Sequence, residues 1–187
     1  LSLKLIIFKK GEFPTMDGIT MPLNDKLVVK FAFEHDLNNI VLALDSVKTS
    51  DNFTFSSPLA YNAIPDLLQL RSSVFELGKI YFLLLDDTET IRGIAEFETS
   101  AISRYITNSV AILSYVSCPS KNLDEFVKGC ASLINKVALC STTKIRTYIP
   151  VDQPEAIESF SHSGFEKAAF LKEEYGKIDV CMMDYFV

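Results

Sequence analysis

A buried strand that runs directly into a long amphipathic helix constrains this chain more than any other feature. Residues Val110–Val116 are mostly apolar, and Leu123–Leu139 carries its apolar side chains at helical spacing. A strand followed by a helix is a common anion site, because the first-turn N–H groups have no partner within the helix. The connecting loop, Ser117–Asn122, contains no glycine, and Asp124 and Glu125 follow it. The architecture therefore favours a phosphate site, whereas the two carboxylates oppose one.

The composition predicts one folded domain and excludes several classes of partner. The 187 residues are 48% hydrophobic, which is enough apolar material for a sizeable core. The net charge of -6 gives no basic surface for nucleic acid or an anionic membrane. No apolar run approaches the roughly 20 residues of a membrane span. Residues Leu1–Phe8 lack a basic lead and a cleavage site, so they predict a strand and not a signal peptide.

The cysteines predict neither a metal site nor a disulfide framework. The four residues are far apart in sequence, without a C-x-x-C pair, and the chain has only two histidines. They are Cys118, Cys130, Cys140 and Cys181. We therefore expect reduced, packed thiols, no metal and a cytoplasmic location.

The order of predicted elements indicates an α/β fold with a central mixed sheet covered by helices. Strands are expected at residues 3–8, 27–33, 79–85, 91–99, 110–116, 144–149, 165–174 and 177–186. Helices are expected at residues 36–44, 65–77, 123–139 and 154–162. We interpret Gly11–Asn24 as an irregular arm, and Thr49–Asn62 and Ser100–Asn108 as loops. The near-continuous apolar run Lys79–Leu85 predicts a strand that is buried on both faces of the sheet.

Three short segments, in this order of elements, resemble the GCN5-related N-acetyltransferase superfamily. They are Thr90–Phe97 (TIRGIAEF), Gln153–Phe165 (QPEAIESFSHSGF) and Gly176–Met182 (GKIDVCM). The resemblance covers residues 26–187 and leaves residues 1–25 as an N-terminal extension. It implies a mostly antiparallel sheet of about seven strands with helices on both faces.

The resemblance also implies where acetyl-CoA would bind. In that family the strand corresponding to Val110–Val116 splays from its neighbour, its main chain holds the pantetheine, and the following loop holds the pyrophosphate. By position, the cofactor-binding residues would be Tyr115, Val116, Ser117, Cys118, Lys121, Asn122, Leu123, Gln153 and Phe160. The glycine-rich loop motif of the family is absent here, and the nearest glycine, Gly129, falls inside the predicted helix.

The two proton-handling groups of the family are replaced at the matching positions. Phe160 stands where a tyrosine commonly protonates the departing thiolate, and Ala111 stands where a glutamate is a frequent base. Glu96 and Glu98, on one face of the adjacent strand, are the substitute candidates for the base. The structural alternative is that both carboxylates form ion pairs with Arg92 or Arg104.

Two functions of different classes follow from these observations. The first is an acetyl-CoA-dependent N-acetyltransferase that acts on a small-molecule or peptide amine by direct attack. The second is a ligand-binding or interaction module that keeps the fold but has lost the cofactor. Binding of acetyl-CoA separates the two. The apolar segment Leu1–Phe8 is also a candidate for pairing with a second copy, which would give a homodimer.

Overall fold

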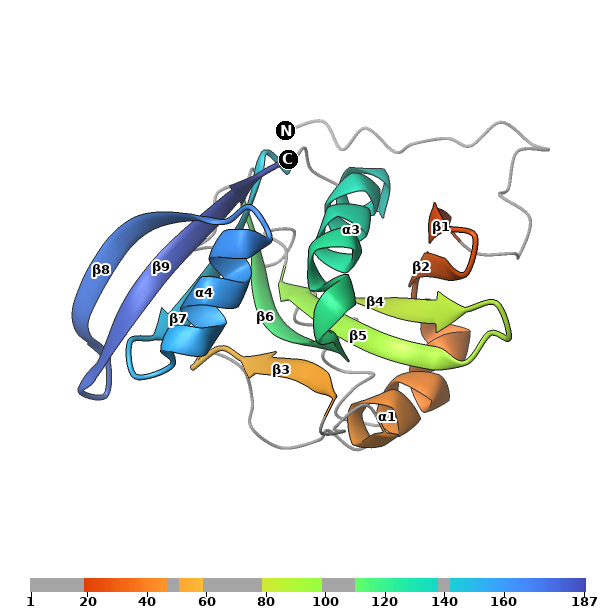
Figure 1. Ribbon diagram of the computed structural model, residues 1–187, viewed down its shortest axis with the longest axis horizontal. Coiled ribbons are helices and arrows are strands. Elements are labelled where there is room, and N and C mark those ends of the chain that lie inside the picture. Colours follow the sequence, from red (N-terminus) through yellow and green to blue (C-terminus); the bar gives the residue numbers. More distant parts are fainter. Residues whose placement is uncertain (1–18, 47–50, 59–78, 99–109, 138–141) are drawn as a thin grey trace, which may run out of the picture.

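A computed structural model describes residues 19–46, 51–58, 79–98, 110–137 and 142–187. The described residues form a mixed α/β structure built on one nine-stranded sheet (Figure 1). The strands are β1 (Thr20–Asn24), β2 (Leu27–Phe31), β3 (Asn52–Ser56), β4 (Lys79–Asp86), β5 (Ile91–Glu98), β6 (Val110–Pro119), β7 (Lys144–Pro150), β8 (Glu166–Tyr175) and β9 (Ile178–Phe186). The helices are α1 (Leu37–Ser46), α3 (Leu123–Val137), α4 (Pro154–His162) and the 3-10 turns η1 (Glu34–Asp36) and η2 (Ser120–Asn122). The predicted fold class is confirmed, with nine strands in place of about seven.

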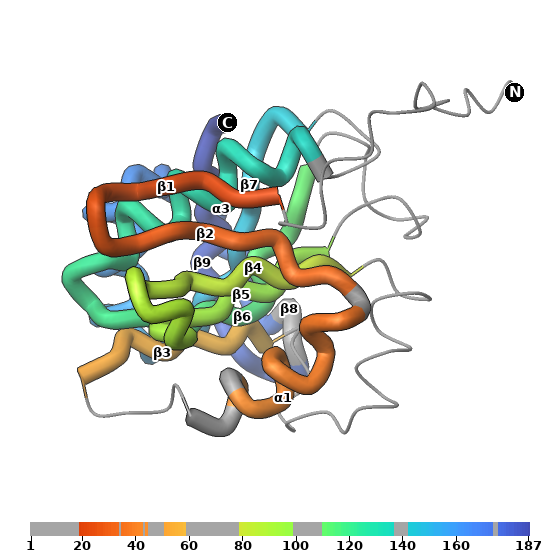
Figure 2. The backbone as a smooth tube through the Cα atoms, turned by 90° about the vertical axis from the view of Figure 1, so that its right-hand side faces the viewer, coloured from red at the N-terminus to blue at the C-terminus, as the bar shows by residue number. Residues whose placement is uncertain are grey.

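The sheet is antiparallel except at one pair of strands. Its order is β1-β2-β4-β5-β6-β7-β9-β8, and β3 pairs with β6 outside this path. The side view in Figure 2 shows β1, β2, β4 and β5 lying side by side. Among the described strands, β6 and β7 alone run parallel to each other. The single parallel pair is therefore the one whose first strand leads into α3.

Helices cover both faces of the sheet, as alternating side chains along its strands require. Phe82 and Leu84 of β4 pack in the cluster that contains the apolar stripe of α3, whereas Tyr81 and Leu83 pack in the cluster that contains α1. We call these the α3 face and the α1 face. Both faces of β4 are therefore buried, which explains why its sequence is almost continuously apolar.

Three of our boundaries differ from the structure because strand pairing extends the sheet. The last five residues of the predicted irregular arm are β1, which pairs with β2. The predicted loop Thr49–Asn62 contains β3, and β6 continues to Pro119 because β3 pairs with its last residues.

Several predicted segments lie outside the described residues. They are the strand at residues 3–8, the helix at 65–77 and the loop at 100–108. The homodimer through Leu1–Phe8 therefore stays a prediction, as does the domain boundary at residue 25.

Gly93 allows β5 and β6 to approach each other closely. A Cβ atom at Gly93 would lie 2.7 Å from Cβ of Cys118 and 2.8 Å from the carbonyl oxygen of Ser117. Because a backbone oxygen cannot rotate away, we expect Gly93→Ala to lower the free energy of unfolding by about 1–3 kcal/mol, measured by urea denaturation.

Gly129→Ala is the matched comparison. Its added Cβ would meet the side-chain methyl groups of Leu23 and Val29, which have some freedom to move, and alanine favours a helix by about 1 kcal/mol over glycine. We therefore expect Gly129→Ala to lower the free energy of unfolding by less than Gly93→Ala does. A larger loss at Gly129 than at Gly93 would contradict this account of the β5–β6 packing.

Candidate cofactor site

Strands β6 and β7 pair over a short length and then separate. Residues Val110–Ile112 of β6 pair with Lys144–Arg146 of β7. One residue further on, Oγ1 of Thr147 donates a hydrogen bond of 3.1 Å to the carbonyl oxygen of Leu113. Beyond this point β7 pairs with β9 but no longer with β6. The structure therefore has the splayed pair of strands that the resemblance implies.

A β-bulge lies in β6 where the separation begins. Glu96 of β5 is paired with Tyr115, whereas the next residue, Phe97, is paired with Leu113. Ser114 is thus the extra residue of the bulge. Bulges are frequent next to active sites, where they redirect a backbone group or side chain.

The edge of β6 that faces the gap is occupied by β3. Residues Asn52–Ser56 pair in antiparallel register with Tyr115–Pro119, and the N–H of Ser57 donates a hydrogen bond of 2.8 Å to the carbonyl oxygen of Ser114. Oγ1 of Thr54 and Oγ of Ser117 are also hydrogen-bonded, at 2.8 Å. The main chain predicted to hold pantetheine is therefore paired with a segment of the protein itself.

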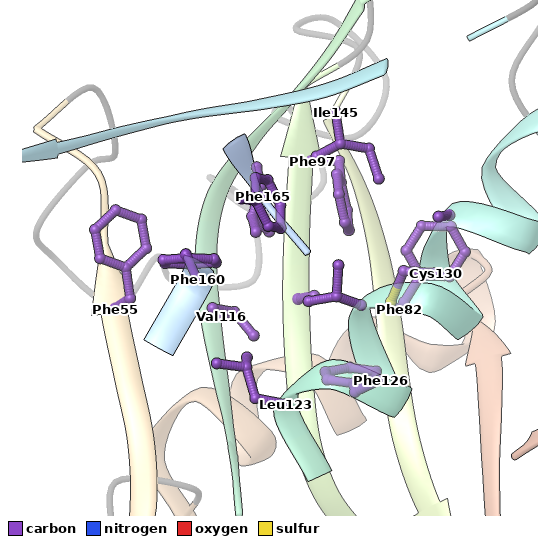
Figure 3. Packing of buried hydrophobic residues seen from close by; sticks show 14 of the residues in the cluster. Phe55, Phe82, Phe97, Val116, Leu123, Phe126, Cys130, Ile145, Phe160 and Phe165 are labelled. Carbon is purple, nitrogen blue, oxygen red and sulfur yellow. The ribbon is translucent and has the colours of Figure 1, made fainter. Parts of the chain in front are cut away.

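Aromatic side chains fix β3 against α4. Phe160 is fully buried, and its ring centroid lies 5.0 Å from that of Phe55 and 5.6 Å from that of Phe53. Phe165 completes the group at 5.1 Å from Phe160. Figure 3 shows Phe55 of β3, Phe160 of α4 and Val116 of β6 gathered on the α3 face. The residue at the family's tyrosine position thus serves as the packing surface for β3.

The connection between β6 and α3 lies at an open cavity of about 700 Å³. Lys121 and Asn122 line it, together with Lys26 and Arg92. Asp51, Asp86 and Asp87 line it as well. Basic and acidic side chains are thus equally represented among the lining residues, so charge alone does not make this cavity an anion site.

The two carboxylates at the start of α3 do not line this cavity. Asp124 forms an ion pair of 2.8 Å with Lys128, one helical turn along, and Glu125 accepts a hydrogen bond of 3.2 Å from Nδ2 of Asn24. Their opposition to a bound anion is therefore weaker than the sequence suggests.

The predicted cofactor residues occupy four separate places. Tyr115, Val116, Ser117 and Cys118 lie in β6 along β3, with Phe160 packed against β3 from α4. Lys121 and Asn122 lie at the cavity, and Leu123 is buried at the start of α3. Gln153 is exposed at the N-cap of α4, where its carbonyl oxygen accepts from the N–H of Ala156. The structure gathers the β6 residues and Phe160 around one gap and leaves Gln153 apart from them.

The candidate bases belong to a buried charged cluster on the α1 face. Glu96 accepts hydrogen bonds from Nζ of Lys79 at 2.7 Å, from Oγ of the bulge residue Ser114 at 2.7 Å, and from the Tyr81 hydroxyl. Glu98 is more exposed and lies 3.7 Å from Nζ of Lys79. Both carboxylates therefore share one lysine next to the bulge.

The ion-pair alternative holds for both carboxylates, with a different partner from those we predicted. Arg92 pairs with Asp86 at 2.7 Å, and Arg104 lies outside the described residues. The hairpin register explains the difference, because Lys79 is paired directly with Glu98 across β4 and β5. The predicted turn alone does not give this pairing, because the register shifts by one residue between Leu84 and Leu85.

The role of β3 was also missed, although its sequence carries a signal. Asn52–Ser56 reads Asn-Phe-Thr-Phe-Ser, so its aromatic residues alternate with polar ones as they do in a half-buried strand. We predicted a loop in which Phe53 and Phe55 are apolar anchors, and the structure shows instead a strand that carries both side chains.

Burial raises the pKa of the Glu98 carboxyl above its ordinary value of 4.5, with Lys79 opposing the shift and Glu96 adding to it. The folded chain therefore keeps this proton to higher pH than the unfolded chain does. Ionisation of Glu98 therefore lowers the free energy of unfolding. This loss is absent below about pH 4.5, where the carboxyl is protonated in both states, and complete above the raised pKa, so stability falls as the pH rises from the first value to the second.

Glu98→Gln should remove this pH dependence. We expect the variant to lose less stability than the wild type as the pH rises from about 4 to 8, measured by urea denaturation at each pH. Glu166→Gln, at an exposed position in the edge strand β8, is the control, and its free energy of unfolding should change with pH as that of the wild type does. The same pH dependence in Glu98→Gln as in the wild type would show that Glu98 does not cause it.

Within the described ranges, no group of three or more His, Cys, Asp or Glu side chains could hold a metal ion. Among the same residues, no helix has the length and apolar character needed to cross a membrane.

Comparisons with known proteins identify the fold. No family model and no curated protein matches the chain. Several solved structures of spermidine N-acetyltransferase SpeG from Vibrio cholerae are similar to it. A dodecameric form in an intermediate state has a TM-score of 0.59 at 17% identity, covering 87% of this chain and 95% of that one. A complex with manganese ions has a TM-score of 0.55 at 17% identity, covering 88% and 95%. The chain therefore has the fold of the GCN5-related N-acetyltransferases.

Proposed function

We propose that this protein is an N-acetyltransferase, which transfers the acetyl group of acetyl-CoA to the amine of a small molecule or peptide. The observation that carries the proposal is the separation of β6 from β7 beyond Ile112, with the bulge at Ser114 at that point. The similarity to spermidine N-acetyltransferases supports the same reaction class.

The gap does not accept a pantetheine chain in the conformation described here. The main-chain groups of Tyr115–Ser117 pair with β3, and Phe55 packs on Phe160. Acetyl-CoA binding along this edge therefore requires a change of conformation.

Glu98 is the better of the two candidate bases. A primary amine is mostly protonated at neutral pH, so attack on a thioester requires a group that takes up a proton. Glu96 is already held by Lys79, Tyr81 and Ser114. Glu98 has a partly exposed side chain and a raised pKa, which suit a proton acceptor. We therefore assign Glu98 as the base and Glu96 as the group that positions Lys79 and the bulge.

The proposed acceptor is a cationic amine. The chain carries a net charge of -6, and its candidate base lies in a cluster with one more carboxylate than cations, Glu96 and Glu98 with Lys79, and both features attract cations. Spermidine, the acceptor named for the similar structures, is therefore the first amine to test, with a lysine-containing peptide as the second.

The test has a binding part and a turnover part. Acetyl-CoA should raise the melting temperature of the full chain by mass action. Thiol release in the presence of spermidine or the peptide should then report transfer. No thermal shift at millimolar acetyl-CoA, either in the wild type or in a variant in which the packing of β3 is weakened, would overturn the proposal. If transfer occurs, Glu98→Gln should slow it by about 100-fold or more.

One observation favours a second candidate, a binding or interaction module without a cofactor. The pairing of β3 with β6 satisfies the groups that pantetheine would use, as expected if the protein segment had permanently replaced the cofactor. Absence of acetyl-CoA binding under all conditions would support this candidate.

A further inference from the structure

The edge of β6 is satisfied along its whole length by groups of the protein. Val110–Ile112 pair with β7, Leu113 accepts from Thr147, Ser114 accepts from Ser57, and the rest pair with β3. Buried backbone N–H and C=O groups need hydrogen-bond partners, and a group that is bonded to β3 is not free to bond to a ligand. Any ligand that binds this edge must therefore first remove β3.

An extended chain with amide groups is what this edge binds. β3 is extended over five residues, so it spans about 17 Å at a strand's usual rise. The pantetheine arm of CoA is also a narrow extended chain with amide groups, and ligands of this shape bind sheet edges by adding a strand. β3 and pantetheine thus compete for the same donors and acceptors.

β3 is attached less firmly than the other strands around it. Among the described strands it pairs with β6 alone, whereas β4, β5 and β7 each pair with two neighbours. Only Phe55 among its side chains is fully buried, and Thr54 is exposed. Its release would expose the side chains of Phe53 and Phe55, the face of Phe160 on which they pack and one row of backbone groups, without opening the sheet between β5 and β6.

We propose that β3 is an internal inhibitory strand, which occupies the pantetheine edge of β6 and must undock before acetyl-CoA binds. This inference rests on the proposed acetyltransferase function. The apparent affinity for acetyl-CoA is then the intrinsic affinity reduced by the fraction of molecules in which β3 has undocked. Release of β3 becomes a point at which the activity can be controlled.

A reversible disulfide between β3 and β6 tests the inference directly. Thr54 and Ser117 face each other across the β3–β6 pair, with their side-chain oxygens 2.8 Å apart. The double variant Thr54→Cys/Ser117→Cys places two thiols at this pair, and oxidation by glutathione disulfide would join them. Acetyl-CoA binding is measured by calorimetry on the same protein in both redox states. We expect at least about tenfold weaker binding in the oxidised state and recovery on reduction.

Loosening β3 gives the opposite expectation. Phe55→Leu removes part of the contact with Phe160 and should tighten acetyl-CoA binding severalfold. Phe82→Leu, in a fully buried site on β4 separated from β6 by β5, is the matched control and should destabilise the fold without tightening binding. Thr54→Cys alone, treated with the same oxidant, controls for the native cysteines.

The outcomes separate the inference from the function on which it rests. Equal affinity in the oxidised and reduced states, with binding by the wild type, would overturn the inhibitory strand and leave the acetyltransferase proposal standing. Absence of binding by the wild type, the reduced double variant and Phe55→Leu alike would overturn both.

Discussion

Lys79→Met is expected to lower the free energy of unfolding by about 3 kcal/mol or more, because it leaves the buried Glu96 carboxylate without its cation. The two side chains are each about one-tenth exposed, at 9% and 11%, and are joined at 2.7 Å. Tyr81 and Ser114 continue to donate to Glu96, which places the loss at the lower end of the range for broken buried pairs. Urea denaturation at neutral pH measures the effect.

A double-mutant cycle shows whether the pair itself is responsible. Glu96→Gln keeps a side chain of the same shape for Tyr81 and Ser114, and it removes the charge that Lys79 neutralises. The double variant Lys79→Met/Glu96→Gln should therefore lose clearly less than the sum of the two single variants. Additive losses would mean that the two residues stabilise the protein independently.

Phe160→Ala should lower the free energy of unfolding by about 3–5 kcal/mol, as is usual for truncation of a fully buried phenylalanine. Its ring packs edge-on against Phe53, Phe55 and Phe165, so its removal leaves a cavity between α4, β3 and the start of β8. The same variant should weaken the docking of β3 on β6. Chemical denaturation measures the global loss, and hydrogen exchange at residues 53–56 measures the local one.

Phe170→Ala is the matched control, since Phe170 lies on the edge strand β8 and is 60% exposed. We expect it to change stability by less than about 0.5 kcal/mol. Comparable losses at Phe160 and Phe170 would show that the aromatic group around Phe160 does not support the fold in the way we describe.

Much of the fold could be read from the sequence because its elements are specified locally. The continuous apolar run of β4 and the amphipathic pattern of α3 identify these elements without reference to their partners. Gly176, which has a positive φ of 60°, lies in the predicted turn of the last hairpin. The order of such elements, with the short segments that resemble the superfamily, was sufficient to predict the fold class.

The candidate site could be predicted only in part from the sequence. Sequence reasoning selected Glu96 and Glu98 together with the β6 residues, and the structure places both sets beside the bulge at Ser114. It did not predict Lys79 as their partner, because that contact depends on the exact register of β4 against β5. A shift by one residue would have turned Lys79 to the other face of the sheet.

The sequence by itself determined the α/β architecture, the strand that leads into α3 and the absence of a glycine-rich loop after it. Only the tertiary structure decided what fills the gap between β6 and β7. Asn52–Ser56 has too few apolar residues to form a strand alone, and its backbone is ordered by pairing with residues about sixty positions away. Such long-range pairing leaves only a weak local signal in the sequence, since its free energy comes from the partner strand and from the burial of Phe55 against Phe160.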